Sequence, residues 1–429
     1  MRGNLSQDSF LSDDFLRQLM SVGEVDLLVG IPSRNDAETI GAVMQSVEVG
    51  LLRNFPRARI VIVNVDAGSR DGTAEAVRKA SSFGNGNTTG IESLRTLRWV
   101  STSSRDEAAP GIMLHTILAA ADLLHAKGCA VVSASTPNLT PAWIGTLLRP
   151  VCDDSFDFVA PLYSRHRYDG LLTRNLLYPL VRTLYGHAIR ELRASEFAFS
   201  GRFAAQCLSR GEWHNEAVQG GAEMWMALHA LSEGYRCCQT YLGPKARPRL
   251  QAGVVNVIRE TLGGLFWCLE AAAPFWLKQE ESGPVQTIGP DHNLTSEPVR
   301  IDRKRFLEMC RHGVAQLSPV LTTILDADTH AELLRLARVP DGEFRLSNSL
   351  WVRVIYEFAA AYHHSVLNRN HLVQAFIPIY RGRVYSLLAQ RRAPTPEEME
   401  ADLEELCREF ADQKAFFLER WKGKERGAS

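Results

Sequence analysis

The sequence predicts an α/β protein, with a Rossmann-like sheet and flanking helices, followed by a region made of helices only. Two apolar, β-branched runs, Val25–Ile31 and Arg59–Val65, are typical of buried parallel strands. Between them, apolar residues recur at the i, i+3, i+4 and i+7 spacing of a helix that packs on a sheet. These residues are Ile40, Val43, Met44 and Val47. From about Gln251 onward, the pattern is that of helices alone.

The other elements of the α/β region follow along the chain. Short apolar runs predict strands, and longer segments with apolar residues on one side predict helices. The expected strands are Leu94–Val100, Ala130–Ala134, Phe156–Tyr163, Phe197–Ser200 and Arg236–Leu242. The expected helices are Phe10–Val22, Met113–Ala126, Ala222–Ser232 and Leu171–Tyr185, the last bent at Pro179. Ser81–Gly90 is expected to be a surface loop, because nothing in it can pack.

Several helix starts carry capping signals. Asn35 with Glu38 three residues later is the pattern of a capping pair for the first helix of the sheet region. Ser347 opens another helix, and Thr395 opens the last one, with a proline at the first helical position and a glutamate three residues past the cap. The expected domains are a leader helix over 1–24, a sheet domain over 25–250 and a helical domain over 251–429.

Composition disfavours several classes of protein. A net charge of −1 over 429 residues, without a basic tract, gives no electrostatic footprint for nucleic acid. The eight cysteines show no Cys-x-x-Cys spacing, so neither a zinc site nor a disulfide framework is indicated. The amino terminus lacks a signal-peptide pattern, and the best apolar run, Val254–Leu277, is interrupted by charged residues. We therefore expect a cytoplasmic protein with no membrane span.

Polar residues follow the first two predicted strands, at the edge where open α/β sheets bind ligands. The first strand runs into Pro32 and Ser33 without a Gly-x-Gly-x-x-Gly fingerprint or a Walker lysine loop, which disfavours a nucleotide-dependent oxidoreductase. The second strand runs into Asp66, which can accept a hydrogen bond from a base or a sugar hydroxyl, and Gly68 permits close approach of a ligand. The alternative is that Asp66 is a plain turn residue.

Two motifs contain these residues. Val29–Ile40 matches (V/I)xxPSxNxxxTI, and Asn64–Thr73 matches NxDxGSxDGT. In this order they resemble the nucleotide-sugar glycosyltransferases of GT-A fold, and most of all the family-2-type branch that contains glucosylglycerate, mannosylglycerate and glucosyl-phosphoglycerate synthases. The resemblance implies a mixed sheet with flanking helices, and hexosyl transfer from a nucleotide-diphosphate sugar. It also implies that the donor is bound by Pro32, Ser33, Asn35, Asp66 and Ser69.

The resemblance also implies a divalent metal ion, for which this chain lacks the expected ligands. GT-A enzymes usually hold magnesium or manganese with an Asp-x-Asp pair at a strand end, because hard oxygen ligands suit these ions. The matching positions here are Ser133 and Ser135. A neutral hydroxyl is a poor ligand for such an ion and neutralises none of its charge. We therefore predict no metal ligands and no cofactor, and place both serines on the donor side of the site.

Other positions depart from the resembled family. Ile112 replaces the lysine of a Pro-Gly-Lys-Gly loop, and Arg247, a donor-binding candidate, stands where relatives commonly carry a histidine metal ligand. Glu196 replaces the aspartate of a Gly-Gly-Asp-Phe stretch, and Glu223 stands where relatives place an aspartate near the reaction centre. Glu196 and Glu223 are therefore the catalytic candidates, although Glu196 could equally be a structural acid. The basic segment 245–249 could stabilise the leaving group by fixed charge.

The loop after Tyr163 is expected to bind the acceptor. In the resembled synthases this loop helps to hold a small acid such as glycerate, and a guanidinium group can fork onto a carboxylate through two hydrogen bonds. The implied acceptor residues are Arg165, Asp169, Thr173 and Asn175. For Arg165 and Arg167 the alternative is a solvated loop face, and His166 is expected to be a surface or hinge residue.

Two hypotheses of function follow. The first is a hexosyltransferase acting on a small polar acceptor, such as glycerate or a related hydroxy acid, with ordinary metal-dependent activity impaired. The second is a non-catalytic relative that keeps the fold, binds nucleotide and works as a regulatory or assembly partner. The apolar faces of the helical domain further suggest a homodimer.

Overall fold

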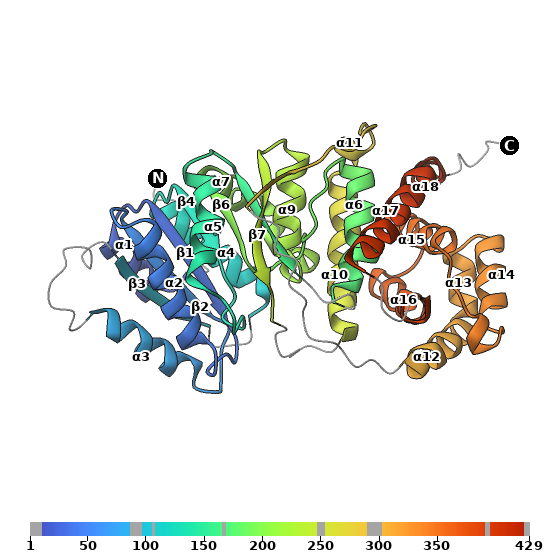
Figure 1. The fold of residues 1–429 in the computed structure, drawn as a ribbon, viewed down its shortest axis with the longest axis horizontal. Coiled ribbons are helices and arrows are strands. Elements are labelled where there is room, and N and C mark those ends of the chain that lie inside the picture. The colour runs from blue at the N-terminus through green and yellow to red at the C-terminus, as the bar shows by residue number, and fades with distance from the viewer. Residues whose placement is uncertain are drawn as a thin grey trace, which may run out of the picture. The chain divides into compact units, whose positions relative to one another are not determined.

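The computed structural model describes residues 11–85, 97–104, 108–164, 169–246, 254–289, 303–390 and 395–423. The chain divides into two compact units that interleave along the sequence (Figure 1). The sheet unit draws on Met1–Ser164, Glu191–Leu250 and Val285–Leu294, and the helical unit on Arg165–Arg190, Gln251–Pro284 and Thr295–Ser429. Each unit therefore takes segments from both sides of residue 250, where the sequence suggests a single boundary.

Among the described residues, eight strands form one sheet in the order β3-β2-β1-β4-β6-β5-β7-β8. The strands are β1 (Leu27–Ser33), β2 (Ile60–Asp66), β3 (Leu97–Ser103), β4 (Gly128–Val131), β5 (Phe158–Ser164), β6 (Phe197–Ser200), β7 (Cys237–Pro244) and β8 (Gln286–Ile288). All neighbours pair in parallel except β6, which is antiparallel to both β4 and β5. The predicted α/β class and the mixed sheet with flanking helices are confirmed.

Helices flank the sheet and build the second unit. Those of the sheet unit are α1 (Asp13–Val22), α2 (Ile40–Asn54), α3 (Thr73–Asn85), α4 (Pro110–Leu123), α5 (Pro141–Cys152), α7 (Gly201–Leu208), η3 (Gly211–His214), α8 (Glu216–Gln219) and α9 (Ala222–Ser232). Those of the helical unit are η2 (Thr173–Leu177), α6 (Tyr178–Tyr185), α10 (Val254–Ala271), α11 (Ala273–Trp276), α12 (Arg303–Gln316), α13 (Ser318–Ile324), α14 (Ala327–Leu336), η4 (Asp341–Glu343), α15 (Asn348–His363), α16 (Arg369–Gln390), α17 (Pro396–Asp412) and α18 (Lys414–Lys422). Within the described ranges, no helix combines the length and the apolar character that crossing a bilayer requires.

The core of the sheet unit packs α2 and α5 on one face of the sheet. Val29 of β1 belongs to the same buried apolar cluster as Ile40 of α2 and Ile144 of α5. On the other face α4 lies so close that a Cβ atom at Gly30 would stand 2.6 Å from Cγ2 of Ile117. Glycine at this position therefore allows α4 to pack directly on β1. The predicted helical stripe is confirmed, with Ile40, Val43, Met44 and Val47 all buried.

The predicted start of α2 is wrong. The helix begins at Ile40, after Thr39, whose side chain makes no capping hydrogen bond. Asn35 lies outside the helix and adopts a left-handed backbone conformation, with φ of 55°. Asparagine tolerates this conformation because its short side chain can hydrogen-bond locally. Asn35 and Glu38 therefore belong to the loop before α2 and do not cap the helix.

Two further predicted segments have different outcomes. The segment predicted as a loop at Ser81–Gly90 begins as helix, because α3 continues to Asn85, and residues 86–90 lie outside the described ranges. The helix predicted over Leu171–Tyr185 is helical throughout, and its π-helical turn η2 continues directly into the α-helix α6. Pro179 has no N–H group to donate to the Asn175 carbonyl four residues earlier. That carbonyl accepts a hydrogen bond from Trp351 Nε1 at 2.8 Å instead.

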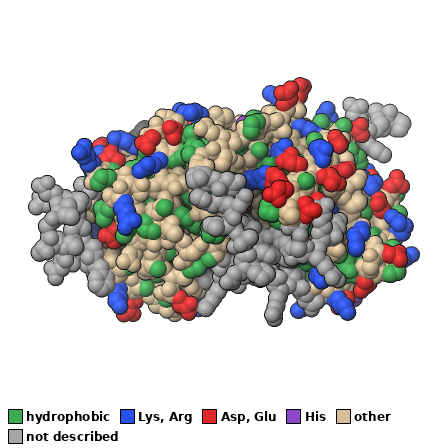
Figure 2. Space-filling view, viewed as in Figure 1, with side chains coloured by type: hydrophobic (Ala, Val, Ile, Leu, Met, Phe, Trp, Pro, Cys, Tyr) green, Lys and Arg blue, Asp and Glu red, His purple; other side chains and the backbone are tan. Residues whose placement is uncertain are grey.

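The start of α17 carries the predicted capping box. Thr395 Oγ1 accepts a hydrogen bond from the Glu398 backbone at 3.2 Å, and Glu398 Oε2 accepts one from the Thr395 backbone at 2.9 Å. The predicted cap of α15 at Ser347 is also confirmed. Acidic side chains gather over α17 (Figure 2), where those of the first turn suit the positive end of the helix dipole. Glu404 ties α17 to Arg182 of α6 with a hydrogen bond of 2.5 Å.

A buried carboxyl group lies next to a partly exposed one in the helical unit. Glu357 of α15 is 2% exposed and accepts hydrogen bonds from the Asp326 backbone at 3.2 Å and from Thr329 Oγ1 at 3.3 Å. Asp326 accepts a hydrogen bond from Arg420 at 2.6 Å. Burial, together with the neighbouring Asp326, raises the pKa of Glu357 to about 8. Glu357 therefore keeps its proton in the folded chain at neutral pH.

This pair predicts that the helical unit loses stability as the pH rises from about 4.5 to about 8. In this range the unfolded chain releases the proton of Glu357, whose ordinary pKa is 4.5, while the folded chain retains it. We expect Glu357→Gln to flatten this part of the profile and to raise the melting temperature at pH 8, because glutamine needs no proton. Calorimetric melting between pH 5 and pH 9 measures the slope of the profile and the melting temperature at pH 8. The control is Glu332→Gln, at a partly exposed ion pair on α14. An unchanged slope in Glu357→Gln would contradict the assignment.

Candidate functional site

The loops that follow β1, β2 and β4 meet at one edge of the sheet. The register of the parallel pair places Ser33, the last residue of β1, beside Asp66, the last residue of β2. The chain beyond β4 continues along β1, because the Ala134 N–H donates to the Pro32 carbonyl at 3.2 Å. Ser133 and Ser135 flank Ala134 and are half-buried. The predicted donor-side residues of β1, β2 and β4 therefore come together at the carboxyl edge.

Asp66 is the buried centre of this edge. Its side chain is 3% exposed, and its two oxygens accept four hydrogen bonds. Oδ1 accepts from Ser33 Oγ at 3.1 Å and from Ser69 Oγ at 2.5 Å, and Oδ2 accepts from the Ser69 backbone and from Ser103 Oγ, both at 2.9 Å. Four donors fill the acceptor capacity of a carboxylate. A base or ribose could reach Asp66 only by replacing one of the serine hydroxyls.

The loops after β1 and β2 are joined by hydrogen bonds between the backbone of one loop and side chains of either loop. The Asn35 N–H donates to Ser69 Oγ at 2.8 Å, and Asn35 Oδ1 accepts from the Arg70 N–H at 2.9 Å. The Asp36 N–H donates to Thr73 Oγ1 at 2.9 Å. Asn35 is exposed and Ser69 is half-buried, so both reach the surface of the edge above the buried Asp66. The loops therefore present polar groups on a fixed backbone.

Asp36 was not identified from the sequence as part of this edge. It is 8% exposed and accepts a hydrogen bond from the Arg34 backbone at 2.8 Å. Burial, with smaller contributions from the charges of Asp71 and Asp66, raises the pKa of Asp36. Its position next to Asn35 in the first motif is the only sequence signal, and nothing in that motif indicates burial. Asp36 is therefore a buried residue that stabilises the backbone of the loop after β1.

Ser133 and Ser135 do not fit a divalent ion. Their hydroxyl groups are 2.8 Å apart and hydrogen-bond to each other, and Ser133 Oγ also accepts from the Ser135 backbone at 3.2 Å. Neither group carries charge, and hard divalent ions favour carboxylate and carbonyl oxygens. Within the described residues, no three histidine, cysteine, aspartate or glutamate side chains are grouped so that they could hold a metal ion. The two serines therefore do not supply the charged ligands that a divalent ion favours.

A buried ion pair lies beside the two serines. Glu196, at 0% exposed, accepts from Thr136 Oγ1 at 2.6 Å, from the Tyr163 hydroxyl, and from Lys245 Nζ at 2.5 Å. Lys245 also donates to Ser195 Oγ at 2.8 Å, and its side chain is 7% exposed. Burial alone would raise the pKa of Glu196, but the Lys245 charge and these hydrogen bonds hold that pKa below its ordinary value. The carboxylate is therefore ionised and enclosed.

This ion pair ties four strand ends together. Thr136 follows β4, Tyr163 lies in the last part of β5, and Lys245 follows β7. Because β6 runs antiparallel to β4 and β5, its amino-terminal end, next to Glu196, lies at the same edge as the carboxyl ends of its neighbours. The geometry gives Glu196 a structural part, and the charge of Lys245 is neutralised by its partner. Arg247 and Arg249 lie outside the described residues.

Glu223, the other catalytic candidate, is less enclosed. It lies in the first turn of α9 and accepts a hydrogen bond from Arg193 Nε at 3.1 Å. Its side chain is 21% exposed, and that of Arg193 is 18% exposed. Arg193 also donates to the Gly220 carbonyl at 3.2 Å, which fixes the guanidinium group against the turn before α9.

The predicted acceptor residues belong to the helical unit. Arg165, His166 and Arg167 lie outside the described residues, Asp169 precedes η2, and Thr173 is its first residue. Asn175 is buried, and its side chain donates to the Leu171 carbonyl at 3.0 Å. Its backbone carbonyl accepts from Trp351 at 2.8 Å. Asn175 therefore holds the interior of the helical unit together, a part that the sequence does not reveal.

Comparisons with known proteins give structural similarity at low identity. No family model matches the chain, and no curated protein matches it. Glucosyl-3-phosphoglycerate synthase from Mycobacterium tuberculosis, in complex with phosphoglyceric acid, is 17% identical, with a TM-score of 0.42, over 60% of this chain and 84% of that chain. Mannosyl-3-phosphoglycerate synthase from Rubrobacter xylanophilus is 20% identical, with a TM-score of 0.43, over 63% and 82%. At these values the likeness does not decide the function of this chain.

The groups that sequence reasoning missed at this edge share one property. Thr136, Tyr163 and Ser103 are ordinary strand-end residues whose partners lie 33 to 60 residues away along the chain. Nothing in their immediate sequence distinguishes them from other polar residues in loops. Only the order of the strands brings them to Glu196 and Asp66.

Proposed function

We propose that the sheet unit binds a nucleotide-diphosphate sugar at the carboxyl edge of β1, β2 and β4. The observation that carries the proposal is that the residues of the two motifs meet there in one hydrogen-bonded arrangement. The groups at the surface of the edge, Asn35, Ser69, Ser133 and Ser135, are the proposed direct contacts. The buried Ser33 and Asp66 hold these contacts in place. Pro32, half-buried beside them, and Arg247 complete the proposed donor site.

The reaction proposed for this site is hexosyl transfer to a small hydroxy acid, such as glycerate. Departure of the diphosphate requires that its growing negative charge be stabilised. Ser133 and Ser135 can each donate one hydrogen bond to diphosphate oxygens if their mutual bond opens, but they supply no positive charge. Since Glu196 neutralises Lys245, that cation adds little. Ordinary metal-dependent activity is therefore expected to be impaired.

The two candidate carboxylates are given different parts. Glu196 is a positioning residue, because its oxygens are occupied and it fixes Thr136 and Lys245 next to the serines. Glu223, partly exposed, is the proposed carboxylate for contact with the transferred sugar. A small acid is proposed as the acceptor because the guanidinium group of Arg165 can form two hydrogen bonds with a carboxylate. Asp169 and Thr173, on the same segment, are the other proposed acceptor contacts. A cytoplasmic location and a homodimer remain predictions.

A second candidate function is a non-catalytic nucleotide-binding partner. Two observations favour it: the serines at the metal position bond to each other, and the buried glutamate beside them is paired with lysine. Such a site can hold a nucleotide through hydrogen bonds and still lack the charge that drives departure of the diphosphate. In that case the chain would bind nucleotide and work as a regulatory or assembly partner.

Titration with UDP-glucose and GDP-mannose tests both candidates. Binding is followed by calorimetry with and without manganese, and turnover by nucleotide release in the presence of glycerate or 3-phosphoglycerate. We expect binding of one nucleotide sugar that manganese leaves unchanged. Slow metal-independent release supports transfer, and binding without release supports the non-catalytic function. Turnover that requires manganese, or no binding of either sugar nucleotide, would contradict the proposed site.

The double variant S133D/S135D sharpens this experiment. It places two carboxylates at the position of the serine pair, so we expect at least tenfold tighter nucleotide binding when manganese is added. The control is S21D/S209D, which adds the same charge at two exposed serines of the sheet unit. An equal response to manganese in both double variants would show that net charge, and not the position of the pair, causes the effect.

A further inference from the structure

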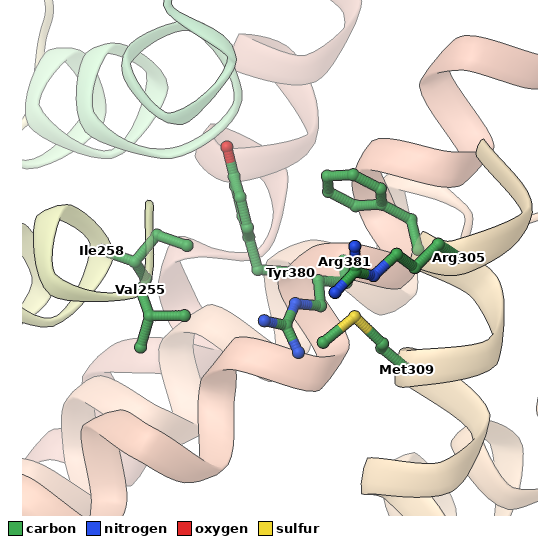
Figure 3. A pocket seen from close by; sticks show the side chains of 7 residues that line it. Val255, Ile258, Arg305, Met309, Tyr380 and Arg381 are labelled. Atoms are coloured by element: carbon green, nitrogen blue, oxygen red, sulfur yellow. The ribbon is translucent and has the colours of Figure 1, made fainter. Parts of the chain in front are cut away.

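A separate cavity of about 260 Å³ lies within the helical unit, where α10, α12 and α16 meet (Figure 3). Most of its wall is apolar and includes Val255, Ile258, Phe306 and Met309. Tyr380 of α16 and two arginines, Arg305 of α12 and Arg381 of α16, also line it. The cavity is slightly smaller than the pockets that hold drug-sized ligands, so it suits a smaller molecule.

Both arginines line this cavity from neighbouring helices. Figure 3 shows Arg305 extending toward Arg381, whose guanidinium group turns away from α12, with Met309 beside it. Burial, with a further contribution from the charge of Arg305, lowers the pKa of Arg381. Within the part of the chain that the structure describes, Arg381 takes part in no ion pair. The positive charge of Arg305 therefore acts on Arg381 beside an apolar space.

The helices that carry the arginines are packed too closely to move apart easily. A Cβ atom at Gly313 of α12 would lie 2.4 Å from Pro378 of α16, and one at Gly382 of α16 would lie 2.6 Å from the sulfur of Cys310. Glycine at both positions therefore allows direct contact between the helices. Gly382 follows Arg381 and Cys310 follows Met309, so the contact fixes the backbone beneath the lining residues. The packing thus fixes the points at which Arg305 and Arg381 leave their helices.

We propose that this cavity binds a small organic phosphate, with its dianionic head between Arg305 and Arg381 and its apolar body against Phe306 and Met309. A phosphate monoester carries close to two negative charges at neutral pH, which matches the charge of two guanidinium groups. Its oxygens can accept pairs of hydrogen bonds from the N–H groups of each guanidinium. The apolar wall adds affinity that inorganic phosphate cannot gain. The site is independent of the nucleotide-sugar site proposed for the sheet unit, so its ligand is a candidate effector.

Calorimetry on the full chain with phenyl phosphate as the probe tests this proposal. We expect phenyl phosphate to bind at least tenfold more tightly than inorganic phosphate, and more tightly than benzoate, which has one charge. Arg381→Met and Arg305→Met should each weaken the binding of phenyl phosphate at least tenfold. The matched control, Arg335→Met at an exposed arginine of α14, should leave it unchanged.

The possible outcomes distinguish binding in this cavity from a general attraction of anions to the protein. Absence of phenyl phosphate binding, or equal weakening in Arg335→Met, would overturn the proposal. So would equal affinity for phenyl phosphate and inorganic phosphate, because the apolar wall would then play no part. A thermal melt of each variant shows whether it folds. Excess UDP should not displace phenyl phosphate, and displacement would assign the probe to the nucleotide site instead.

Discussion

Replacing Lys245 by methionine is expected to destabilise the sheet unit by about 3–5 kcal/mol, the cost of leaving a buried charge without its partner. Glu196 is 0% exposed, and the Lys245 ammonium is its only partner of opposite charge among the described residues. Thr136 and Tyr163 would still donate hydrogen bonds, but two neutral donors do not replace the ion pair. The loss should be smaller at pH 4, because Glu196 without its lysine would take up a proton.

Urea unfolding of a double-mutant cycle measures this coupling. Lys245→Met and Glu196→Gln are compared with the double variant, in which no charge is left buried and much of the stability should return. The control is Lys127→Met, at the exposed pair with Asp26, for which less than about 1 kcal/mol is expected. If Lys245→Met costs no more than this control, Glu196 is not held by the lysine and its structural part is wrong.

Replacing Asp66 by asparagine is expected to weaken nucleotide binding and to destabilise the sheet unit by about 2–4 kcal/mol, since buried donors lose their acceptor. The amide group keeps one oxygen but turns an N–H₂ group toward donors of Ser69 or Ser103. The loops after β1 and β2 would lose one of the groups that join them. Because these loops carry the proposed contacts, we expect at least tenfold weaker binding of the nucleotide sugar.

Urea unfolding and calorimetry with the nucleotide sugar measure the two effects on Asp66→Asn separately. Asp122→Asn, at an exposed carboxylate of α4, is the control and should change neither. Ser103→Ala removes a single donor to Asp66 and should cost much less stability. Unchanged nucleotide binding in a folded Asp66→Asn variant would mean that the nucleotide does not depend on this edge.

The sequence reveals those features of the fold that repeat along a short stretch of chain. The buried stripe of α2, the strands β1 and β2, and the capping box at Thr395 all follow from local spacing. The start of α2 does not, because Asn35 satisfies the capping pattern while its backbone bonds to Ser69 of another loop. Local signals cannot show which of two partners a polar side chain selects.

The candidate site is likewise predictable only where the signal is local in the sequence. The motifs around Ser33 and Asp66 predict that the two loops meet, which they do. They do not predict that Asp66 is fully occupied, because its donors come from three segments of the chain. Glu196 is the clearest example of a residue whose partner the sequence does not predict. Nothing near it in the sequence reveals that Lys245, 49 residues later, neutralises it.

A crystal structure of the chain grown with UDP and manganese tests the central claim most directly. We predict the nucleotide on the loops after β1 and β2, within contact distance of Asn35 or Ser69, and its diphosphate at Ser133 and Ser135 with no manganese ion between them. A manganese ion bound beside the two serines, or a nucleotide bound elsewhere on the chain, would contradict this account.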